Sequence, residues 1–218
     1  MALHGVDLSH HNSAEVFDLC LKEEDFIILK ATEGRTYRDP MFTYRQPRLV
    51  GGDVRRGYYH YARPENNNPE EEVNNFLATI GSDARDALLI LDWEGNALRK
   101  DFQWALDWCN ILRDKIKNAR PILYASASTI RKYANLIQEN DLSVWTAHYN
   151  YKCANGCVHD GSIVEIMTQY ISLGVDRNIF HADTWERWTA NRDTVPVTEK
   201  IAEWTEGNCT YVVTRQKK

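Results

Sequence analysis

The sequence lacks the features that would point to membranes or nucleic acids. Its formal net charge is −5 at pH 7, and this acidic balance argues against a nucleic-acid footprint. The apolar run at residues 87–91 is far shorter than the roughly 20 residues that a transmembrane helix needs. The first residues, MALHGVDLSHHN, contain no basic region followed by a long apolar one, so they do not resemble a signal peptide. We therefore expect synthesis in the cytoplasm, no nucleic-acid partner and no membrane insertion.

Cysteine is scarce as well. The chain has five cysteines, an odd number that cannot pair completely within one chain, at a density too low for a disulfide scaffold. Cys20 and Cys109 fall at apolar positions of expected helices, which predicts buried thiols. Cys153 and Cys157 lie in the segment HYNYKCANGCVHD, residues 148–160. Their loose spacing favours an irregular loop over a zinc site or a local disulfide, so we expect no metal and no other cofactor.

Strand-like apolar segments alternate with helical patterns, which is typical of a mostly parallel sheet covered by helices. A full (β/α)8 barrel usually takes about 250 residues, so eight strands within residues 3–178 predict a compact, irregular TIM-like (β/α) barrel. An open doubly wound sheet is the alternative, although no Gly-rich phosphate loop follows the first strand. The expected strands are residues 3–8, 25–34, 55–63, 87–95, 120–126, 142–149, 165–172 and 173–178.

Four segments carry helix patterns. Apolar residues recur at helical spacing within residues 101–118. Asn68 and Pro69 form a helix start, with three glutamates following near the positive end of the helix dipole. Residues 12–23 and 128–138 also read as capped helices.

The stretch ALLILDWEGN, residues 87–96, places two carboxylates at the end of a buried strand. Because side chains alternate along a strand, Asp92 and Glu94 should point to one side and Trp93 to the other. Two acids on one face repel each other, and this repulsion tends to separate their pKa values. From this stretch alone, an acid/base pair and a pair of solvated or helix-capping acids are about equally favoured.

Acids or aromatic residues stand near the end of every expected strand. The ends of barrel strands converge on one mouth, where active sites are built. We therefore predict a wide, acidic groove lined by aromatic rings, a combination suited to the hydrolysis of glycosidic bonds. The residues concerned are Asp7, Glu33, Tyr59, Tyr61, Asp92, Glu94, Tyr124, Trp145, Gln169 and Asp176.

The pattern changes after about Asp183. Residues 184–218 contain three tryptophans, a helix-like stretch around residues 197–205 and the strand-like run CTYVV. The segment is short for an independent domain, and no Gly/Ser linker precedes it. We therefore divide the chain into a barrel, residues 1–183, and a C-terminal extension packed on it, residues 184–218. An oligomerisation element and the remnant of a wall-binding module are the alternatives.

The ordered motifs GVDLSHHN, FIILKATEG, GYYHYARP, LLILDWEG, PILYAS, VWTAHY, TQY and VDRNIF resemble those of the family 25 glycoside hydrolases, the Chalaropsis-type lysozymes. The resemblance covers residues 4–181. It implies a flattened β/α barrel that hydrolyses the β-1,4 bond between N-acetylmuramic acid and N-acetylglucosamine in peptidoglycan. Two features differ from the common pattern: HHN lacks a Gly that often follows, and KCANGCVHD is an insertion.

The resemblance also implies roles for individual residues. Glu94 would be the general acid/base, and Asp92 would position and stabilise the 2-acetamido group of the substrate. Asp7 and Asp176 would complete the acidic cluster. The groove would be lined by Glu33, Tyr59, Tyr61, Tyr124, Trp145 and Gln169.

A wall-degrading enzyme of this size without a signal peptide resembles a phage endolysin. Such an enzyme acts at the bacterial cell wall after a holin-type partner permeabilises the membrane of the host. Two other readings remain: a chitinase-like hydrolase of N-acetylglucosamine polymers, and a non-catalytic sugar-binding barrel. The first is weakened because only the last two acids of the D-x-x-D-x-D-x-E pattern are present. The second is weakened by Glu94 and the aspartates near it.

Cys153 and Cys157 are predicted to be dispensable for chemistry, because no acidic residue of the expected groove depends on them. Replacing both with Ser should leave the turnover of soluble peptidoglycan fragments within a few-fold of the parent. Steady-state kinetics and metal analysis of the purified protein check this. Stoichiometric zinc, together with loss of activity on chelation, would contradict it.

Overall fold

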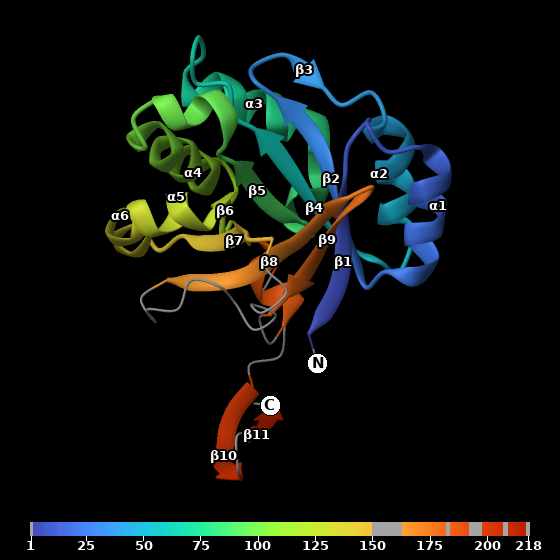
Figure 1. Ribbon diagram of the computed structural model, residues 1–218, viewed down its shortest axis with the longest axis vertical. Coiled ribbons are helices and arrows are strands. Elements are labelled where there is room, and N and C mark those ends of the chain that lie inside the picture. The colour runs from blue at the N-terminus through green and yellow to red at the C-terminus, as the bar shows by residue number, and fades with distance from the viewer. Residues whose placement is uncertain (1, 150–162, 182–183, 192–197, 207–208, 217–218) are drawn as a thin grey trace.

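The computed structural model describes residues 2–149, 163–181, 184–191, 198–206 and 209–216 (Figure 1). Its main sheet has the strand order β1-β9-β8-β7-β6-β5-β4-β2-β3, and β1 also pairs with β2. This additional pairing closes the sheet into a barrel and leaves β3 outside the ring, so the predicted TIM-like barrel is confirmed. The strands are β1 Leu3–Leu8, β2 Phe26–Glu33, β3 Tyr37–Arg38, β4 Arg55–Tyr61, β5 Leu88–Asp92, β6 Ile122–Ser126, β7 Ser143–Ala147, β8 Val164–Leu173 and β9 Val175–Phe180.

The last barrel strand runs against the others. Neighbouring strands from β1 through β2 and β4 to β8 pair in parallel, whereas β9 pairs antiparallel with both β8 and β1. From the sequence, Asp176 is expected near the end of a strand, but it lies near the start of β9. Because β9 is antiparallel, its start lies at the same mouth as the ends of the parallel strands. Asp176 therefore faces Asp7 directly across β1 and β9.

Helices cover the barrel unevenly. In Figure 1, α1 and α2 lie beside β1, and α3 to α6 lie on the other side. Between β7 and β9 the described residues contain no helix. The helices are α1 Ala14–Glu23, α2 Phe42–Val50, α3 Pro69–Ile80, α4 Gln103–Lys115, α5 Ala127–Lys132 and α6 Ala134–Glu139. None of the helices in the described ranges has the length and apolar character needed to span a bilayer.

Local sequence explains several of the helix starts. Asn68 and Glu71 form a reciprocal capping box at the start of α3, and the Ser13 side chain caps α1. The single helix expected at residues 128–138 is instead two helices, α5 and α6, that meet at Tyr133. The backbone of Tyr133 leaves the helical region there, and its ring stacks on Phe102 with the centroids 4.2 Å apart. Tertiary stacking thus interrupts a pattern that propensity alone would continue.

Side-chain alternation on the strands divides the core into two clusters. The first lies between strands and helices and includes Ile27 and Leu29 of β2, with Phe76 of α3. The second fills the interior of the barrel and includes Phe26 and Ile28 of β2. Because side chains two positions apart share one face of a strand, the polar residues that come two positions after an interior residue at a strand end point towards the open mouth of the barrel.

The C-terminal extension begins with a packed segment. Trp185, in the short 3-10 helix Trp185–Trp188, is buried between Phe26 and Phe180, with ring centroids 5.0 and 4.9 Å away. Further on, β10 Thr198–Glu206 and β11 Cys209–Gln216 pair antiparallel. The helix expected around residues 197–205 is therefore wrong, whereas the CTYVV strand is confirmed. Figure 1 shows this hairpin beyond the barrel, and packing of the whole extension stays a prediction.

Ending the chain after residue 183 is expected to lower the melting temperature and the yield, because it removes Trp185 from the barrel core. Loss of a large buried aromatic side chain typically costs about 3–5 kcal/mol. A chain that ends after Asn191 keeps Trp185 and is the matched control, to be compared by thermal unfolding. If the shorter chain is equally stable but no longer binds whole cell walls, the extension is a binding element instead.

Candidate active site

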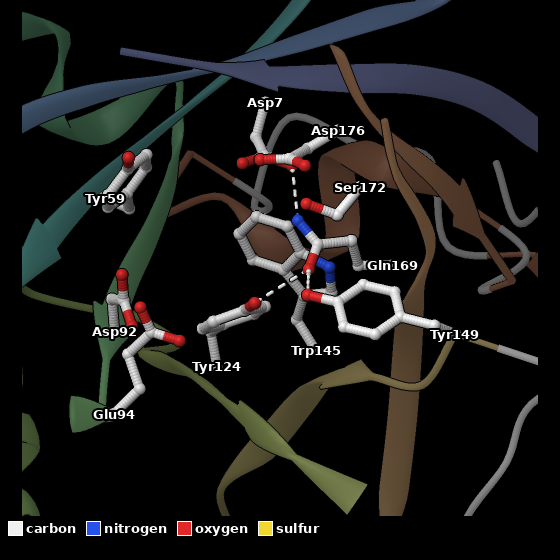
Figure 2. Close-up of a pocket in the computed structure, with 10 residues that line it drawn as sticks. All are labelled: Asp7, Tyr59, Asp92, Glu94, Tyr124, Trp145, Tyr149, Gln169, Ser172 and Asp176. Atoms are coloured by element: carbon white, nitrogen blue, oxygen red, sulfur yellow. Dashed lines mark hydrogen bonds between the residues drawn. The ribbon is translucent and has the colours of Figure 1, made fainter. Parts of the chain in front are cut away.

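A cavity of about 190 Å³ opens at the mouth of the barrel (Figure 2). It brings together eight of the ten side chains predicted from the sequence and adds Tyr149 and Ser172. Figure 2 shows Asp7 and Asp176 beside each other, across the cavity from Asp92 and Glu94. The lining residues are Asp7, Tyr59, Asp92, Glu94, Tyr124, Trp145, Tyr149, Gln169, Ser172 and Asp176.

Asp92 and Glu94 share one side of the chain at the end of β5, as alternation predicts. Trp93 points the other way, is 1 % exposed and stacks on Trp104 with the centroids 5.8 Å apart. Its backbone N–H donates to the carbonyl oxygen of Tyr124 at 2.9 Å, which ties this segment to β6. The chain then turns at Gly95, whose φ of +58° lies in the left-handed region that favours glycine.

Burial is the main influence on both carboxyl groups. It raises the pKa of Asp92 well above the ordinary value, and the charge of Glu94 adds to this rise. The pKa of Glu94 is raised by burial and by Asp176, while Lys30 opposes the rise at both residues. Asp92 Oδ1 is buried without a hydrogen-bond partner among the described residues. Such an oxygen is expected to find its partner in a bound molecule or water.

Asp7 and Asp176 form a second acidic pair. They are directly opposite on β1 and β9, a position at which like charges repel. Burial, followed by the charge of Asp176, raises the pKa of Asp7 to about 7. Hydrogen bonds from Asn178 and Gln169 to Asp7 Oδ2, at 2.7 and 3.0 Å, act in the opposite direction.

Asn178 and Tyr149 were missed in the sequence, although each left a signal there. Asn178 is two residues beyond Asp176 on β9, so alternation places both on one face. Tyr149 lies two residues beyond the end of β7 and donates from its hydroxyl to Gln169 Oε1 at 3.0 Å. A search for polar residues two positions beyond each predicted acid would have found Asn178.

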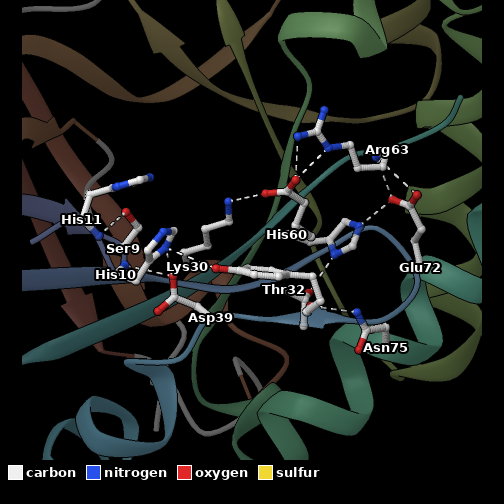
Figure 3. Close-up of polar contacts among 12 residues, drawn as sticks. Ser9, His10, His11, Lys30, Thr32, Asp39, His60, Arg63, Glu72 and Asn75 are labelled. Carbon is white, nitrogen blue, oxygen red and sulfur yellow. Dashed lines mark hydrogen bonds and ion pairs between the residues drawn. The ribbon is translucent and has the colours of Figure 1, made fainter.

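Glu33 and Tyr61, both predicted to line the groove, do not enter the cavity. They pair with each other at the outermost register position of β2 and β4. Glu33 accepts from Lys30 Nζ at 2.6 Å and from Arg63 Nε at 2.7 Å. Figure 3 shows the two donors, Lys30 and Arg63, with the dashed lines of these contacts. Burial alone would raise the pKa of Glu33, but the hydrogen bonds from Lys30 and Arg63 outweigh it and lower that pKa. The Tyr61 ring lies 4.9 Å from Lys30 Nζ, so both predicted residues hold the cation at the rim.

A second hollow of about 530 Å³ adjoins the first and shares Glu94, Tyr124 and Tyr149 with it. Its other side consists of the loop after β5, the start of α5 and the end of β7. Glu94 therefore stands at the boundary between two hollows. A chain-like ligand that occupies both would pass directly over its carboxyl group.

Cys20 and Cys109 are free and buried, as predicted. Residues 150–162, which include Cys153 and Cys157, lie outside the described residues. Within the described ranges, no group of three or more His, Cys, Asp or Glu side chains is placed to hold a metal ion. The expectation that the chemistry is metal-free stays a prediction.

The family model for glycosyl hydrolases family 25 matches residues 6–178. An uncharacterized protein of Escherichia coli K12, YegX, is 27 % identical over 156 residues, covering 67 % of this chain and 56 % of YegX. The chain thus spans little more than half the length of that curated relative.

Solved structures share the fold at low sequence identity. A family GH25 lysozyme from Aspergillus fumigatus superimposes with a TM-score of 0.71 at 20 % identity, covering 87 % of this chain and 100 % of the lysozyme. The catalytic domain of endolysin ply40, from bacteriophage P40 of Listeria monocytogenes, gives a TM-score of 0.61 at 19 % identity. That match covers 84 % of this chain and 95 % of the endolysin domain.

Asp7→Asn is expected to stabilise the protein more at pH 8 than at pH 5. With a pKa near 7 in the folded state, against an ordinary value of 3.8, Asp7 holds a proton that the unfolded chain releases. The folded state is therefore weakened progressively as pH rises between these values. Asn cannot ionise, so this loss disappears in the variant. The gain in melting temperature over the parent should be roughly 3 °C or more at pH 8 and smaller at pH 5.

Asp53→Asn is the matched control, because Asp53 is exposed. It makes the same change of side chain outside the cavity, so it measures the effect of the substitution itself at each pH. A gain for Asp7→Asn that is the same at both pH values would show that Asp7 ionises normally in the folded protein.

Proposed function

The chain belongs to glycosyl hydrolase family 25, and from this premise we propose that it is a lysozyme that cuts bacterial peptidoglycan. As an N-acetylmuramidase it hydrolyses the β-1,4 bond between N-acetylmuramic acid and N-acetylglucosamine. The observation that carries the proposal is the pair Asp92 and Glu94, which share one face at the end of β5 in an acidic cavity. The similarity in fold between this chain and the Aspergillus fumigatus lysozyme supports the same proposal.

Glu94 acts as the general acid/base. Burial and the charge of Asp176 raise its pKa, which favours the protonated form that substrate must meet. Glu94 gives this proton to the departing sugar oxygen and takes one from water in the second step. Its position between the two hollows supports this role, because a glycan strand that occupied both would carry the bond between two sugars past its carboxyl group.

Asp92 acts on the 2-acetamido group of the substrate. The acetamido oxygen attacks the sugar carbon, so no carboxylate of the protein forms a covalent bond with the sugar. Asp92 Oδ1, buried and without a partner among the described residues, is suited to accept from the amide N–H. Its charge, when present, would also stabilise the positive ring that forms.

Other residues of the cavity complete the site for the glycan strand. Asp7 and Asp176 complete the acidic cluster on the far side of the cavity. Of the aromatic lining residues, Tyr59 and Tyr149 are exposed enough to offer their rings to the faces of sugars, whereas Trp145 and Tyr124 are only 2 % and 7 % exposed. Because both hollows are open, the substrate is a polymer bound along its length rather than a single small sugar.

In its biological setting the chain acts at the bacterial cell wall as an endolysin. It is made in the cytoplasm of the host and reaches peptidoglycan with the help of a holin-type permeabilising partner. The similarity in fold to the catalytic domain of endolysin ply40 supports this setting. Lysis of host cells by the chain with and without a co-expressed holin tests it.

Glu94→Gln is expected to lower turnover by roughly 100-fold or more, because the amide keeps the shape but cannot donate the proton. Asp92→Asn should be severely impaired too, while both variants stay folded and bind wall fragments. Clearing of a peptidoglycan suspension, with products identified by mass, measures the effect. Glu139→Gln, an exposed carboxyl on α6, is the control and should keep parental turnover.

Near-normal turnover by folded Glu94→Gln would defeat the assignment of the acid. A covalent sugar ester trapped on Asp92 and seen by mass spectrometry would defeat the substrate-assisted step alone. A folded parent that binds walls without releasing fragments would instead indicate a non-catalytic sugar-binding barrel.

A further inference from the structure

The amide of Asn178 has a fixed orientation. Asn178 is fully buried, and its Oδ1 accepts from Trp145 Nε1 at 2.9 Å. An indole N–H can only donate, so it must face the amide oxygen. The amide nitrogen Nδ2 is thereby turned towards Asp7 Oδ2, 2.7 Å away, with a longer contact of 3.5 Å to the carbonyl of Asp176.

Gln169 approaches Asp7 from the other side. Its Oε1 accepts from the hydroxyl of Tyr124 at 2.7 Å and from that of Tyr149 at 3.0 Å. Its Nε2 donates to Asp7 Oδ2 at 3.0 Å. Gln169 is 3 % exposed, and both ends of its amide are occupied by protein partners. The sequence predicted a substrate contact here, yet the geometry commits the amide to Asp7 (Figure 2).

We propose that Asn178 and Gln169 are positioning residues that fix one oxygen of Asp7 as a hydrogen-bond acceptor and leave the other to the substrate. Both amides donate to Oδ2, and neither contacts Oδ1. A proton on Asp7 is therefore confined to Oδ1, because two N–H groups already point at Oδ2. Trp145 acts one step further away, because its indole N–H can only donate and so prevents the Asn178 amide from turning over. The hydroxyls of Tyr124 and Tyr149 occupy the oxygen of the Gln169 amide.

This inference rests on the proposed function and adds a role for side chains that do not themselves react. The amide donors of Asn178 and Gln169 also influence the pH at which Asp7 ionises, because hydrogen bonds to a carboxylate favour its charged form. Other groups around Asp7 influence the same equilibrium and must be kept constant. They are Asp176 on β9, Tyr59 on β4, Asp92 and Glu94 at β5, Tyr124 on β6 and Tyr149 after β7.

The test is the titration of the Asp7 carboxyl carbon, followed by NMR in the full chain. Asn178→Leu keeps most of the volume but removes one donor, so the Asp7 midpoint should rise by about one pH unit or more. Trp145→Phe keeps an aromatic ring but removes the N–H that orients Asn178, so a smaller rise in the same direction is expected.

Trp188→Phe is the matched control. Trp188 Nε1 is buried without a hydrogen-bond partner in the described part of the chain, so its loss should leave the Asp7 midpoint unchanged. If Asn178→Leu does not fold, Trp145→Phe decides the matter. Unchanged Asp7 midpoints in the folded variants would overturn the proposal.

Activity gives a second readout. If the proposed site needs Asp7 in its ionised form, the higher Asp7 midpoint in Asn178→Leu should move the acidic limb of the kcat/KM profile to higher pH. KM at high pH, where Asp7 is ionised in both proteins, should stay close to that of the parent. A uniform loss at every pH would indicate a merely structural role and overturn the proposal. Because the NMR titration needs no turnover, a parent that fails to cut peptidoglycan would defeat the proposed function and leave this test intact.

Discussion

The pairing of β1 with two different neighbours is the constraint on which the rest of the structure depends. β1 pairs in parallel with β2 and antiparallel with β9, and these two ladders close the barrel. Closure satisfies the backbone groups that an open edge would expose, and it brings distant strands to one mouth. Asp7 lies on the strand that makes this closure, opposite Asp176 and across the cavity from Asp92 and Glu94. Without the ring these four acids would have no common cavity.

The cavity gathers four carboxyl groups at a cost in stability. Burial raises the pKa of Asp7, Asp92 and Glu94, so each is held in an environment that disfavours its charge. Lys30, anchored by Glu33 and the Tyr61 ring, opposes the rise at Asp92 and Glu94. Glu33 and Tyr61 thus hold the cation that partly offsets the rise in the pKa of Asp92 and Glu94. This gives them a physical role although neither lines the pocket.

The sequence predicted the strands and most lining residues because alternation and strand ends are local properties. It failed where geometry depends on contacts far along the chain, as at Tyr133, whose stacking on Phe102 divides α5 from α6. The antiparallel direction of β9 could have been predicted from the sequence. Only Gly174 separates β8 from β9, and a parallel strand needs a crossover of a dozen or more residues. The hydrogen bond from Gln169 to Asp7 could not be predicted, because a sequence shows that an amide is present but not which partners occupy its two ends.

The exposure of Asp92 and Glu94 separates their proposed roles where their spacing does not. Both follow the same strand on the same face, but Asp92 is 7 % exposed and Glu94 is only partly buried. A general acid/base must release its proton to the leaving sugar and then take one from water, so it needs contact with solvent. A group that orients the acetamido arm needs a fixed position and exchanges no proton with water. Partial exposure therefore suits Glu94 to proton transfer, and burial suits Asp92 to orientation.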